Sequence, residues 1–369
     1  MLDARVEKLA QVLVQYSVSV RPDDKVYLQG STLAEPLLKA LFIEVLKAGG
    51  NPYVRAQLPG TEELFYRYAS DEQLRHVAPP SRLLYESYDV IISLWGSANT
   101  KELTNVPPEK LVLAQQSSRE ISQAVTRRAA SGELRWVGTL FPTAAHAQDA
   151  EMGQTEYEDF VFSACLPDFE HPVRHWQQVS AWQQRLVDWL KGKEALRVEG
   201  PDVDLRMRIA GRTFMNCDGK RNMPDGEIFT GPVEDSVEGH VRFSYPTVYR
   251  GRRLDGVHIW FKKGKVVKAT ADKGEDFLLQ TLDADDGARY VGEFAIGTNE
   301  GITRATGHTL FDEKINGSFH MALGAGMPET GSHNESAIHW DMVCDLMRGG
   351  RIWVDEQLIY ENGSFLIGN

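Results

Sequence analysis

The stretch KVYLQGSTLAEPLLKALFIEVLKAGGNPYVRA, residues 25–56, decides the fold class of the first half of the chain. Lys25–Leu28 is a short apolar run, and Leu33–Ala48 repeats apolar residues at helical spacing until two glycines end it. Pro52–Ala56 is again strand-like. A strand, a helix and a second strand in this order are typical of a parallel sheet, because short parallel strands are connected through helices.

The same alternation continues along the chain to about residue 175. Val90–Trp95 and Leu134–Leu140 predict two further strands, with helical segments between them. We therefore expect residues 1–175 to form an α/β domain with a parallel sheet that helices cover on both faces. Residues 1–18 have the pattern of a charged amphipathic helix and not that of a signal peptide.

The pattern changes after a tryptophan-rich helix that we expect over His175–Leu190. Short strand-like segments with turn residues between them follow, at Asp204–Ile209, Val257–Phe261, Val266–Ala271, Tyr290–Ile296 and Arg351–Val354. Lys263-Gly264 predicts a hairpin turn, since glycine tolerates the positive φ that such turns require. Helical signal is sparse apart from Gly274–Leu282. Residues 176–369 are therefore expected to form an α+β domain rich in antiparallel strands.

Length and composition limit the classes of protein to which the chain can belong. Its 369 residues exceed a typical single core, which favours two domains. The net charge of −12 argues against a nucleic-acid partner, which needs a basic surface. No apolar run reaches the length of about 20 residues that spans a bilayer, so we expect no membrane partner. Three cysteines without C-x-x-C spacing are typical of reduced thiols and predict a cytoplasmic location.

A histidine and an aspartate lie two residues apart in Ser336–Val343, with the sequence SAIHWDMV. In a strand, His339 and Asp341 share one face, while Ile338 and Trp340 share the other. The polar face then offers an imidazole and a carboxylate to one cation. Such a pair on a half-exposed strand is also typical of a solvated surface, so both interpretations stay open.

Three more acidic or imidazole side chains stand in contexts that suit a ligand role. Glu293 interrupts the apolar run VGEFAI, so its carboxylate is buried and needs a proton, an arginine partner or a metal ion. His320 begins an apolar, glycine-rich stretch and is either a hydrogen-bonded core residue or a ligand. Glu227 follows a Pro-Asp-Gly turn and is either an exposed glutamate or a ligand at the start of a strand.

Together these residues favour a metal centre of mixed imidazole and carboxylate ligands. Such ligands suit zinc, cobalt or manganese, and we expect no cysteine near enough for a thiolate site. Several carboxylates with few histidines suit two divalent metal ions that share a bridging ligand, about 3.5–4 Å apart. No H-E-x-x-H motif is present, because the ligands are dispersed along the chain.

The chain resembles the metallo-aminopeptidases of the aminopeptidase T and PepS type, a thermophilic aminopeptidase family. Four stretches carry the resemblance: NMPDGEIFTGPVEDSVEG (222–239), GEFAIG (292–297), FDEKINGSFHMALG (311–324) and NESAIHWDMV (334–343). Their order and approximate spacing agree with the family. The resemblance extends to the α/β first half and so covers essentially the whole chain.

The resemblance implies a set of metal ligands, and these are Glu227, Glu293, His320, His339 and Asp341. Glu293 would be the bridge between two cations, and Glu313 would be either a ligand or a proton-transfer group. The family also implies a homodimer and a peptide substrate with a free N-terminus. Two cations would activate a water for release of the N-terminal amino acid.

One departure from the family keeps alternative functions open. The family commonly has a tyrosine in a G-Y-P context after the first histidine, and here Met327 stands in that place. A thioether can neither donate a proton nor bind a hard cation well. The alternatives are a metal-dependent amidase or deacylase acting on other amino-acid conjugates, and a non-catalytic member that binds peptides or metal. Gln29-Gly30-Ser31 is a lone glycine turn without a nucleotide-binding pattern.

Overall fold

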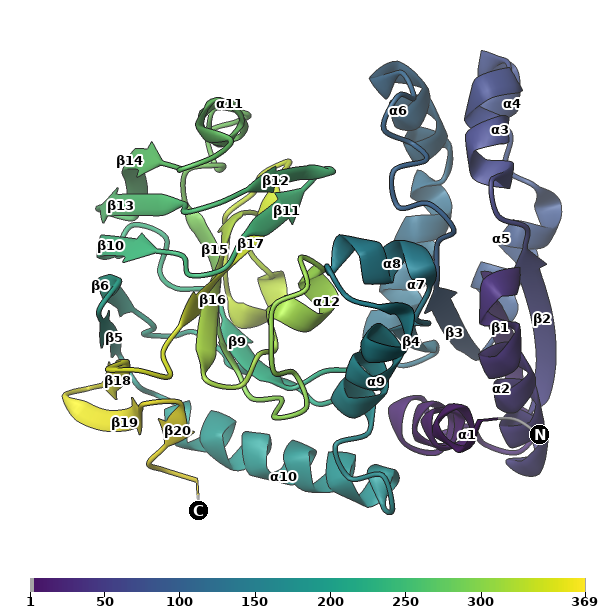
Figure 1. Ribbon diagram of the computed structural model, residues 1–369, viewed down its shortest axis with the longest axis horizontal. Coiled ribbons are helices and arrows are strands. Elements are labelled where there is room, and N and C mark those ends of the chain that lie inside the picture. Colours follow the sequence, from purple (N-terminus) through teal and green to yellow (C-terminus); the bar gives the residue numbers. More distant parts are fainter. Residues whose placement is uncertain (1–2, 369) are drawn as a thin grey trace. The chain divides into compact units, whose positions relative to one another are not determined.

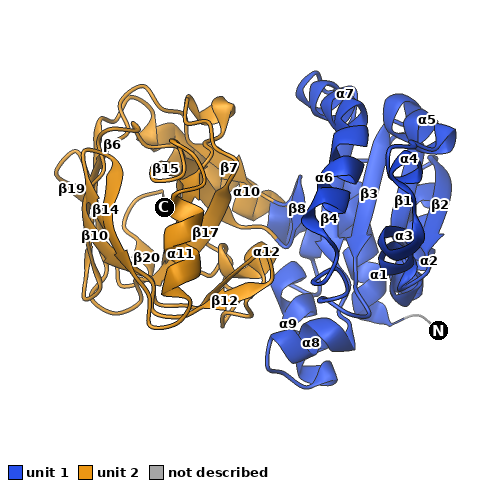
Figure 2. Cartoon of the chain, turned by 90° about the horizontal axis from the view of Figure 1, so that it is seen from above, with its two compact units in different colours: residues 1–176, 219–224 blue, residues 177–218, 225–369 orange. Residues whose placement is uncertain are grey.

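The computed structural model describes residues 3–368, which form two compact units (Figure 2). Of the described residues, unit 1 comprises 3–176 and 219–224, and unit 2 comprises 177–218 and 225–368. The short segment 219–224 lies in the half of the sequence that we assigned to the second domain. It joins unit 1 because its strand β8 pairs with β4.

Unit 1 contains a five-stranded sheet in which every pairing is parallel, in the order β2-β1-β3-β4-β8 (Figure 1 for β1 to β4, Figure 2 for all five strands). Its strands are β1 (Lys25–Ser31), β2 (Asn51–Gln57), β3 (Val90–Trp95), β4 (Arg135–Leu140) and β8 (Asn222–Met223). The parallel sheet expected from the first half of the sequence is therefore confirmed. The two-residue β8 has no counterpart in the sequence prediction.

Helices cover both faces of this sheet, as expected. Helix α2 (Glu35–Lys47) packs against β1 and β2, with Val45 beside Val26. Helices α5 (Pro79–Ser87) and α7 (Arg119–Ala130) cover the face that carries Tyr27 and Ile91. The remaining helical segments are α1 (Ala4–Gln11), a π-helix (Val12–Ser17), a 3₁₀ turn (Thr32–Ala34), α3 (Thr61–Tyr68), α4 (Asp71–Leu74), α6 (Pro108–Ser117), α8 (Ala144–Asp149) and α9 (Gln154–Cys165).

The N-terminal amphipathic segment is helical over its described part, while Met1 and Leu2 lie outside the described residues. Asp3 caps α1 by accepting a hydrogen bond from the backbone N–H of Arg5, 2.8 Å away. Among residues 3–368, no helix combines the length and the apolar character that crossing a membrane requires.

Unit 2 begins within the long helix α10 (Pro172–Leu190) and contains two larger antiparallel sheets. The eight-stranded sheet runs in the order β14-β13-β10-β6-β5-β18-β19-β20. Its strands are β5 (Ala195–Gly200), β6 (Val203–Arg208), β10 (Glu238–Arg242), β13 (His258–Lys262), β14 (Lys265–Thr270), β18 (Arg351–Val354), β19 (Gln357–Glu361) and β20 (Ser364–Phe365). The predicted hairpin turn between β13 and β14 is present, with φ of 48° at Lys263 and 76° at Gly264.

The five-stranded sheet of unit 2 runs in the order β17-β16-β15-β9-β7. Its strands are β7 (Met215–Cys217), β9 (Glu227–Thr230), β15 (Val291–Gly297), β16 (Ser318–Gly324) and β17 (His339–Asp345). Phe294, Phe319 and Trp340 from this sheet share one buried core with residues of the larger sheet such as Val198 and Ile259. The remaining elements are β11 (Thr247–Tyr249), β12 (Arg252–Leu254), α11 (Glu275–Leu282), α12 (Thr309–Asp312) and a 3₁₀ turn (Pro328–Thr330). The predicted second half rich in antiparallel strands is confirmed.

Candidate metal centre

The polar face of the five-stranded sheet brings together residues that are far apart in the sequence. Ala322 on β16 pairs with Glu293 on one side and with Asp341 on the other. His320, two residues earlier on β16, points to the same face because side chains alternate along a strand. His339 lies two residues before Asp341 on β17 and shares that face too.

Each polar side chain has a small residue directly opposite it on one neighbouring strand, which leaves space above the sheet. Glu227 on β9 pairs with Gly297, and His320 pairs with Ala295. His339 pairs with Gly324. Directly opposed side chains in a sheet lie close together, so a glycine or alanine at these positions keeps the neighbouring volume free of side-chain atoms.

A β-bulge at Gly292 turns Glu293 toward this face. Val291 pairs with Leu323 and Glu293 pairs with Ala322, so the register shifts between them. Without the bulge, Val291 and Glu293 would point the same way. With it, Val291 and Phe294 both join the apolar core, and the Glu293 carboxylate lies on the opposite face. Gly292 permits the bulge because a Cβ there would lie 2.2 Å from the Ala325 carbonyl oxygen.

The carboxylate of Glu293 lies between the two imidazoles. Its Oε1 is 3.2 Å from His320 Nε2, and its Oε2 is 3.5 Å from His339 Nε2. His320 Nε2 is also 3.7 Å from Glu227 Oε2 and 3.9 Å from Asp341 Oδ1. His339 Nε2 is 3.5 Å from that same Asp341 oxygen. One carboxylate therefore offers a different oxygen to each histidine.

Backbone carbonyls fix the orientation of both rings. His320 Nδ1 donates a hydrogen bond to the carbonyl oxygen of Glu313 at 3.0 Å, and His339 Nδ1 donates to that of Ala325 at 2.8 Å. A carbonyl only accepts, so the proton resides on Nδ1 in each neutral ring. The Nε2 lone pairs then face the carboxylates, as in the ligand histidines of metal sites.

The possible ligand atoms form overlapping groups. Glu227, Glu293 and His320 offer atoms that all lie within 4.8 Å of one another, and so do Glu293, His339 and Asp341. Glu293 belongs to both groups. A third group consists of Glu313, His320 and Asp341.

The residues fit divalent cations by their burial and by their unsatisfied oxygens. His320 is fully buried, and the side chains of Glu227 and Glu293 are nearly so. Glu227 Oε2 and Asp341 Oδ1 are buried but accept no hydrogen bond within the described residues. A buried acceptor without a donor costs about 1–3 kcal/mol, so these oxygens need a cation or a proton. Imidazole and carboxylate ligands together suit zinc and related divalent ions.

The protonation pattern shows how strongly the site favours positive charge. Burial lowers the pKa of His320, but the hydrogen bond to Glu293 and the nearby Glu227 outweigh it and raise this pKa to about 10. At His339, burial is outweighed in the same way by the adjacent Asp341, and the pKa is raised to about 9. Burial raises the pKa of Glu227 to about 8.

Lys314 is a neighbour of the centre that the sequence interpretation missed. Its side chain is fully buried, and its Nζ lies 3.5 Å from Glu227 Oε1 and in short contact with the Glu313 carboxylate. Burial lowers the pKa of Lys314, but Glu227, Glu313 and Asp225 raise it well above its ordinary value. No signal in the sequence marks it, because Lys314 stands in the mostly polar segment Asp312–Asn316, where nothing indicates that it is buried.

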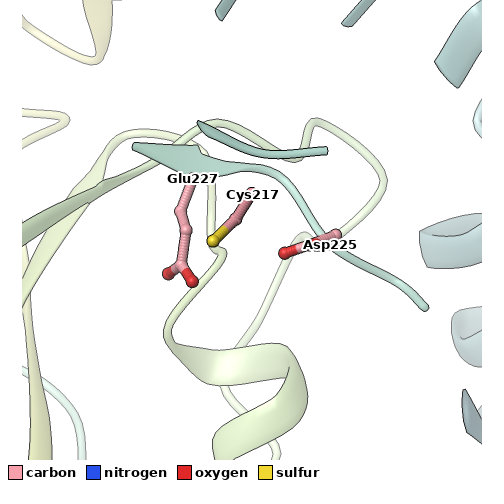
Figure 3. A group of neighbouring side chains, drawn as sticks. All are labelled: Cys217, Asp225 and Glu227. Carbon is pink, nitrogen blue, oxygen red and sulfur yellow. The ribbon is translucent and has the colours of Figure 1, made fainter. Parts of the chain in front are cut away.

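A thiol also lies near the centre, and this corrects the expectation that no cysteine does. Cys217 on β7 pairs with Glu227 on β9, and Asp225 completes a group whose possible ligand atoms lie within 4.8 Å (Figure 3). Cys217 is also only half-buried, unlike Cys165 and Cys344. The sequence hides this neighbour because β7 is only three residues long and gives no strand signal.

Glu313 lies at the edge of the centre, beside His320 and Asp341. It also lines a cavity of about 20 Å³ together with Asp341 and Thr247. Burial raises the pKa of Glu313, which favours its protonated form. Met327 follows β16, is half-buried and precedes the 3₁₀ turn at Pro328.

Comparison with known proteins places this geometry in a family. Residues 2–365 match the family model described as thermophilic metalloprotease (M29). The chain belongs to the thermophilic metalloprotease family. Aminopeptidase T of Thermus thermophilus is 28% identical over 302 residues, which cover 73% of this chain and 72% of that protein. Aminopeptidase 2 of Geobacillus stearothermophilus is 25% identical over an alignment that covers 100% of this chain and 92% of that protein.

Solved structures share the fold of this thermophilic metalloprotease. Wild-type AmpT from Thermus thermophilus superposes with a TM-score of 0.83 at 22% identity, covering 98% of this chain and 99% of that one. A 2,5-dihydroxypyridine dioxygenase from Pseudomonas putida superposes with a TM-score of 0.61 at 13% identity, covering 98% and 96%. The resemblance seen in the sequence is therefore confirmed. The chain is a metal-dependent enzyme of the aminopeptidase class, a hydrolase.

Proposed function

We propose that this chain releases N-terminal amino acids from peptides at a centre of two divalent metal ions. One observation carries the proposal: Glu293 is the residue that the two ligand groups share, and it offers one oxygen to the histidine of each group. Glu227, Glu293 and His320 would hold one ion, and Glu293, His339 and Asp341 the other. Zinc, cobalt and manganese all suit these ligands.

When bound, two such ions supply Lewis-acid chemistry that activates a water and polarises the scissile carbonyl. The chain's own residues then supply positioning and proton transfer. Backbone carbonyls hold the two imidazoles so that Nε2 faces the centre. Glu313 is the proposed proton-transfer group, because burial raises its pKa toward the range in which a carboxyl group both accepts and donates a proton.

Specificity for a free N-terminus follows from the ways in which the site can hold an amino group. Carboxylates of Glu227, Glu293, Glu313 and Asp341 gather at one face, where the two ions and Lys314 would neutralise their charge. A substrate α-amino group can bind one ion as a neutral amine, or it can face a carboxylate that no ion holds as an ammonium. An acetylated N-terminus can make neither of these two contacts.

The test is hydrolysis of a leucine anilide before and after removal of metal. Dialysis against a chelator is expected to abolish turnover, and zinc, cobalt or manganese is expected to restore it. Peptides with free N-termini should be cleaved from that end, while their acetylated counterparts should not be cleaved. Activity that survives thorough metal removal would overturn the proposal, and cleavage of the acetylated peptides would favour a deacylase or amidase instead.

Met327 makes a non-catalytic member the remaining alternative. Such a protein would bind metal at the same centre and turn over no peptide. Metal content measured on the sample used for the hydrolysis assay separates the two cases.

A homodimeric state and a cytoplasmic location belong to the same proposal. The resemblance to the family supports the dimer, and three cysteines without a disulfide support the location. Sedimentation velocity would measure the oligomeric state directly. A monomer at micromolar concentration would exclude the dimer.

A further inference from the structure

Unit 1 contains a crevice of about 300 Å³ that the chemistry of the metal centre does not use. Its walls come from the carboxyl ends of three neighbouring strands: Gln29–Ser31 at the end of β1, Arg55 and Gln57 at the end of β2, and Ser93–Trp95 at the end of β3. The loops that follow β2 and β3 complete it, through Leu58–Glu62 and through Gly96–Ala98 with Glu102.

The crevice lies where the strand order of the sheet reverses. From β1 the chain adds β2 on one side and then β3 and β4 on the other. The loops that follow β1 and β3 therefore diverge, and open parallel sheets bind their ligands at this point, outside the carboxyl ends of the strands. Gly30 lets the two strand ends approach closely, since a Cβ there would lie 2.8 Å from the Leu94 Cβ.

Charges of both signs line this crevice without a charged partner in the described residues. Arg55 is exposed and interacts with the Tyr27 side chain but makes no ion pair with a described carboxylate, and Glu62 and Glu102 make none with a described cation. Burial raises the pKa of Glu102, and the nearby carboxylate of Glu62 raises it further. Two acidic groups thus lie near each other on one part of the lining, and all three charged side chains remain open to a ligand of complementary charge.

The neutral lining is partly fixed in place. The Gln29 side chain donates a hydrogen bond to Ser93 Oγ at 2.8 Å and accepts one from the Tyr85 hydroxyl at 3.1 Å. Trp95 supplies an apolar wall and is 41% exposed, which leaves ring surface for a ligand to cover. Fixed polar groups beside an apolar surface are typical of small-molecule sites, whose volumes begin at about 300 Å³.

We propose that this crevice binds a free α-amino acid in its zwitterionic form. Arg55 receives the carboxylate, Glu62 and Glu102 receive the ammonium group, and the side chain lies along Trp95. A phosphate-bearing ligand fits less well, because two carboxylates repel it and no glycine-rich phosphate loop is present in the lining. Amino acids are also the products of the proposed function. The charge pattern of the crevice supports the binding site whether or not the metal centre turns over peptides.

The test is equilibrium dialysis of radiolabelled L-leucine against the full-length protein in chelator, so that metal in unit 2 cannot hold the ligand. Saturable binding with a Kd at or below about 10 mM is expected. N-acetylleucine and leucinamide, which each lack one charge, should compete at least about tenfold more weakly. Arg55→Gln and Glu102→Gln should each weaken leucine binding by at least about tenfold, while Arg67→Gln, outside the crevice, should leave it unchanged.

Several results would overturn the proposal. These are no saturable leucine binding, equal competition by N-acetylleucine, tighter competition by inorganic phosphate, and unchanged leucine binding in Arg55→Gln. Circular dichroism and thermal midpoints show whether each variant is folded. Leucine anilide hydrolysis by the metal-loaded variants is expected to be retained. Leucine binding in chelator therefore tests the crevice, and hydrolysis by the metal-loaded protein tests the metal centre, so that either proposal can fail without the other.

Discussion

The ammonium group of Lys314 lies fully buried against the carboxylates of Glu227 and Glu313. Breaking a buried ion pair from one side leaves uncompensated charge, which typically costs about 3–5 kcal/mol. We therefore expect Lys314→Met to lower the free energy of unfolding of the metal-free protein by about that amount. Urea denaturation in the presence of a chelator measures this free energy of unfolding. Lys262→Met, on an exposed lysine of β13, is the control, and equal small effects for both variants would contradict the role of Lys314.

Metal binding is expected to release protons. The pKa of His320 is raised to about 10 and that of His339 to about 9, so both rings are charged at pH 7.5 in the metal-free protein. Coordination requires neutral imidazoles and an ionised Glu227, whose pKa is raised to about 8. Binding should therefore release about two to three protons per chain, and the apparent metal affinity should increase with pH up to about 10. Isothermal titration calorimetry in buffers of different ionisation enthalpy counts these protons. Binding without proton release would show that the histidines are not ligands.

The raised pKa values of His320 and His339 also make the stability of the metal-free protein depend on pH. This stability falls as the pH rises, whereas the metal affinity increases. Because these groups hold protons more tightly in the folded state, they stabilise the metal-free fold below their unfolded pKa, near 6.5. This stabilisation is lost as the pH rises through about 9 and 10. The free energy of unfolding of the metal-free protein should therefore fall in alkali, while its affinity for metal increases.

Some residues of the candidate metal centre could be recognised from local patterns in the sequence. The alternation around His339 and Asp341 puts both on one strand face, and a carboxylate inside VGEFAI can be recognised as buried. Lys314 and Cys217 stayed hidden, because their proximity to the centre depends on chain pairing that no local pattern records. Their positions follow only from the packing around β9.

At the scale of elements, the bulge at Gly292 decides which way Glu293 points. An alanine Cβ at this position would lie 2.2 Å from one backbone carbonyl oxygen and 2.5 Å from another. We expect Gly292→Ala to destabilise the protein by about 1–3 kcal/mol and to lower its metal content, since the strand must shift to relieve the contact. Gly153→Ala is the control, because no atom lies within 4 Å of the added carbon. Full metal content in Gly292→Ala would show that the bulge does not position Glu293.

Strands were predictable where they carried a long apolar signal. The expected bounds Val90–Trp95 and Arg351–Val354 are those of β3 and β18. The bulge was not predictable, because VGEFAI has the composition of a regular strand and only pairing with β16 reveals the shift. The short strands β7 and β8 were missed because two or three residues give no periodicity.

At the scale of the whole molecule, the two compact units should respond differently to metal. A ligand at 1,000 times its Kd stabilises the state that binds it by about 4 kcal/mol. We expect hydrogen exchange at short times to slow in β15, β16 and β17 on adding zinc, and to stay unchanged in β1 and β3. Mass spectrometry of peptic fragments measures both. Equal protection in the two units would contradict a metal site confined to unit 2.

The fold alone does not determine the chemistry of this chain. A dioxygenase shares it at a TM-score of 0.61, so the ligand residues and not the architecture must support the function. Length favoured two domains, but the boundary near residue 175 stays a prediction about folding units. Segment 219–224 could not have been assigned in advance, because β8 pairs with a strand about 80 residues earlier in the chain.

The shared carboxylate of Glu293 makes a quantitative prediction for metal content. Protein loaded with zinc and freed of excess metal is expected to contain about two ions per chain by plasma mass spectrometry. Glu227→Gln and Asp341→Asn should each retain about one ion, and Glu293→Gln should retain well below one. Glu300→Gln, on an exposed carboxylate just after β15, should retain about two. Two ions in Glu293→Gln, or one in the unaltered protein, would contradict a centre in which Glu293 bridges two cations.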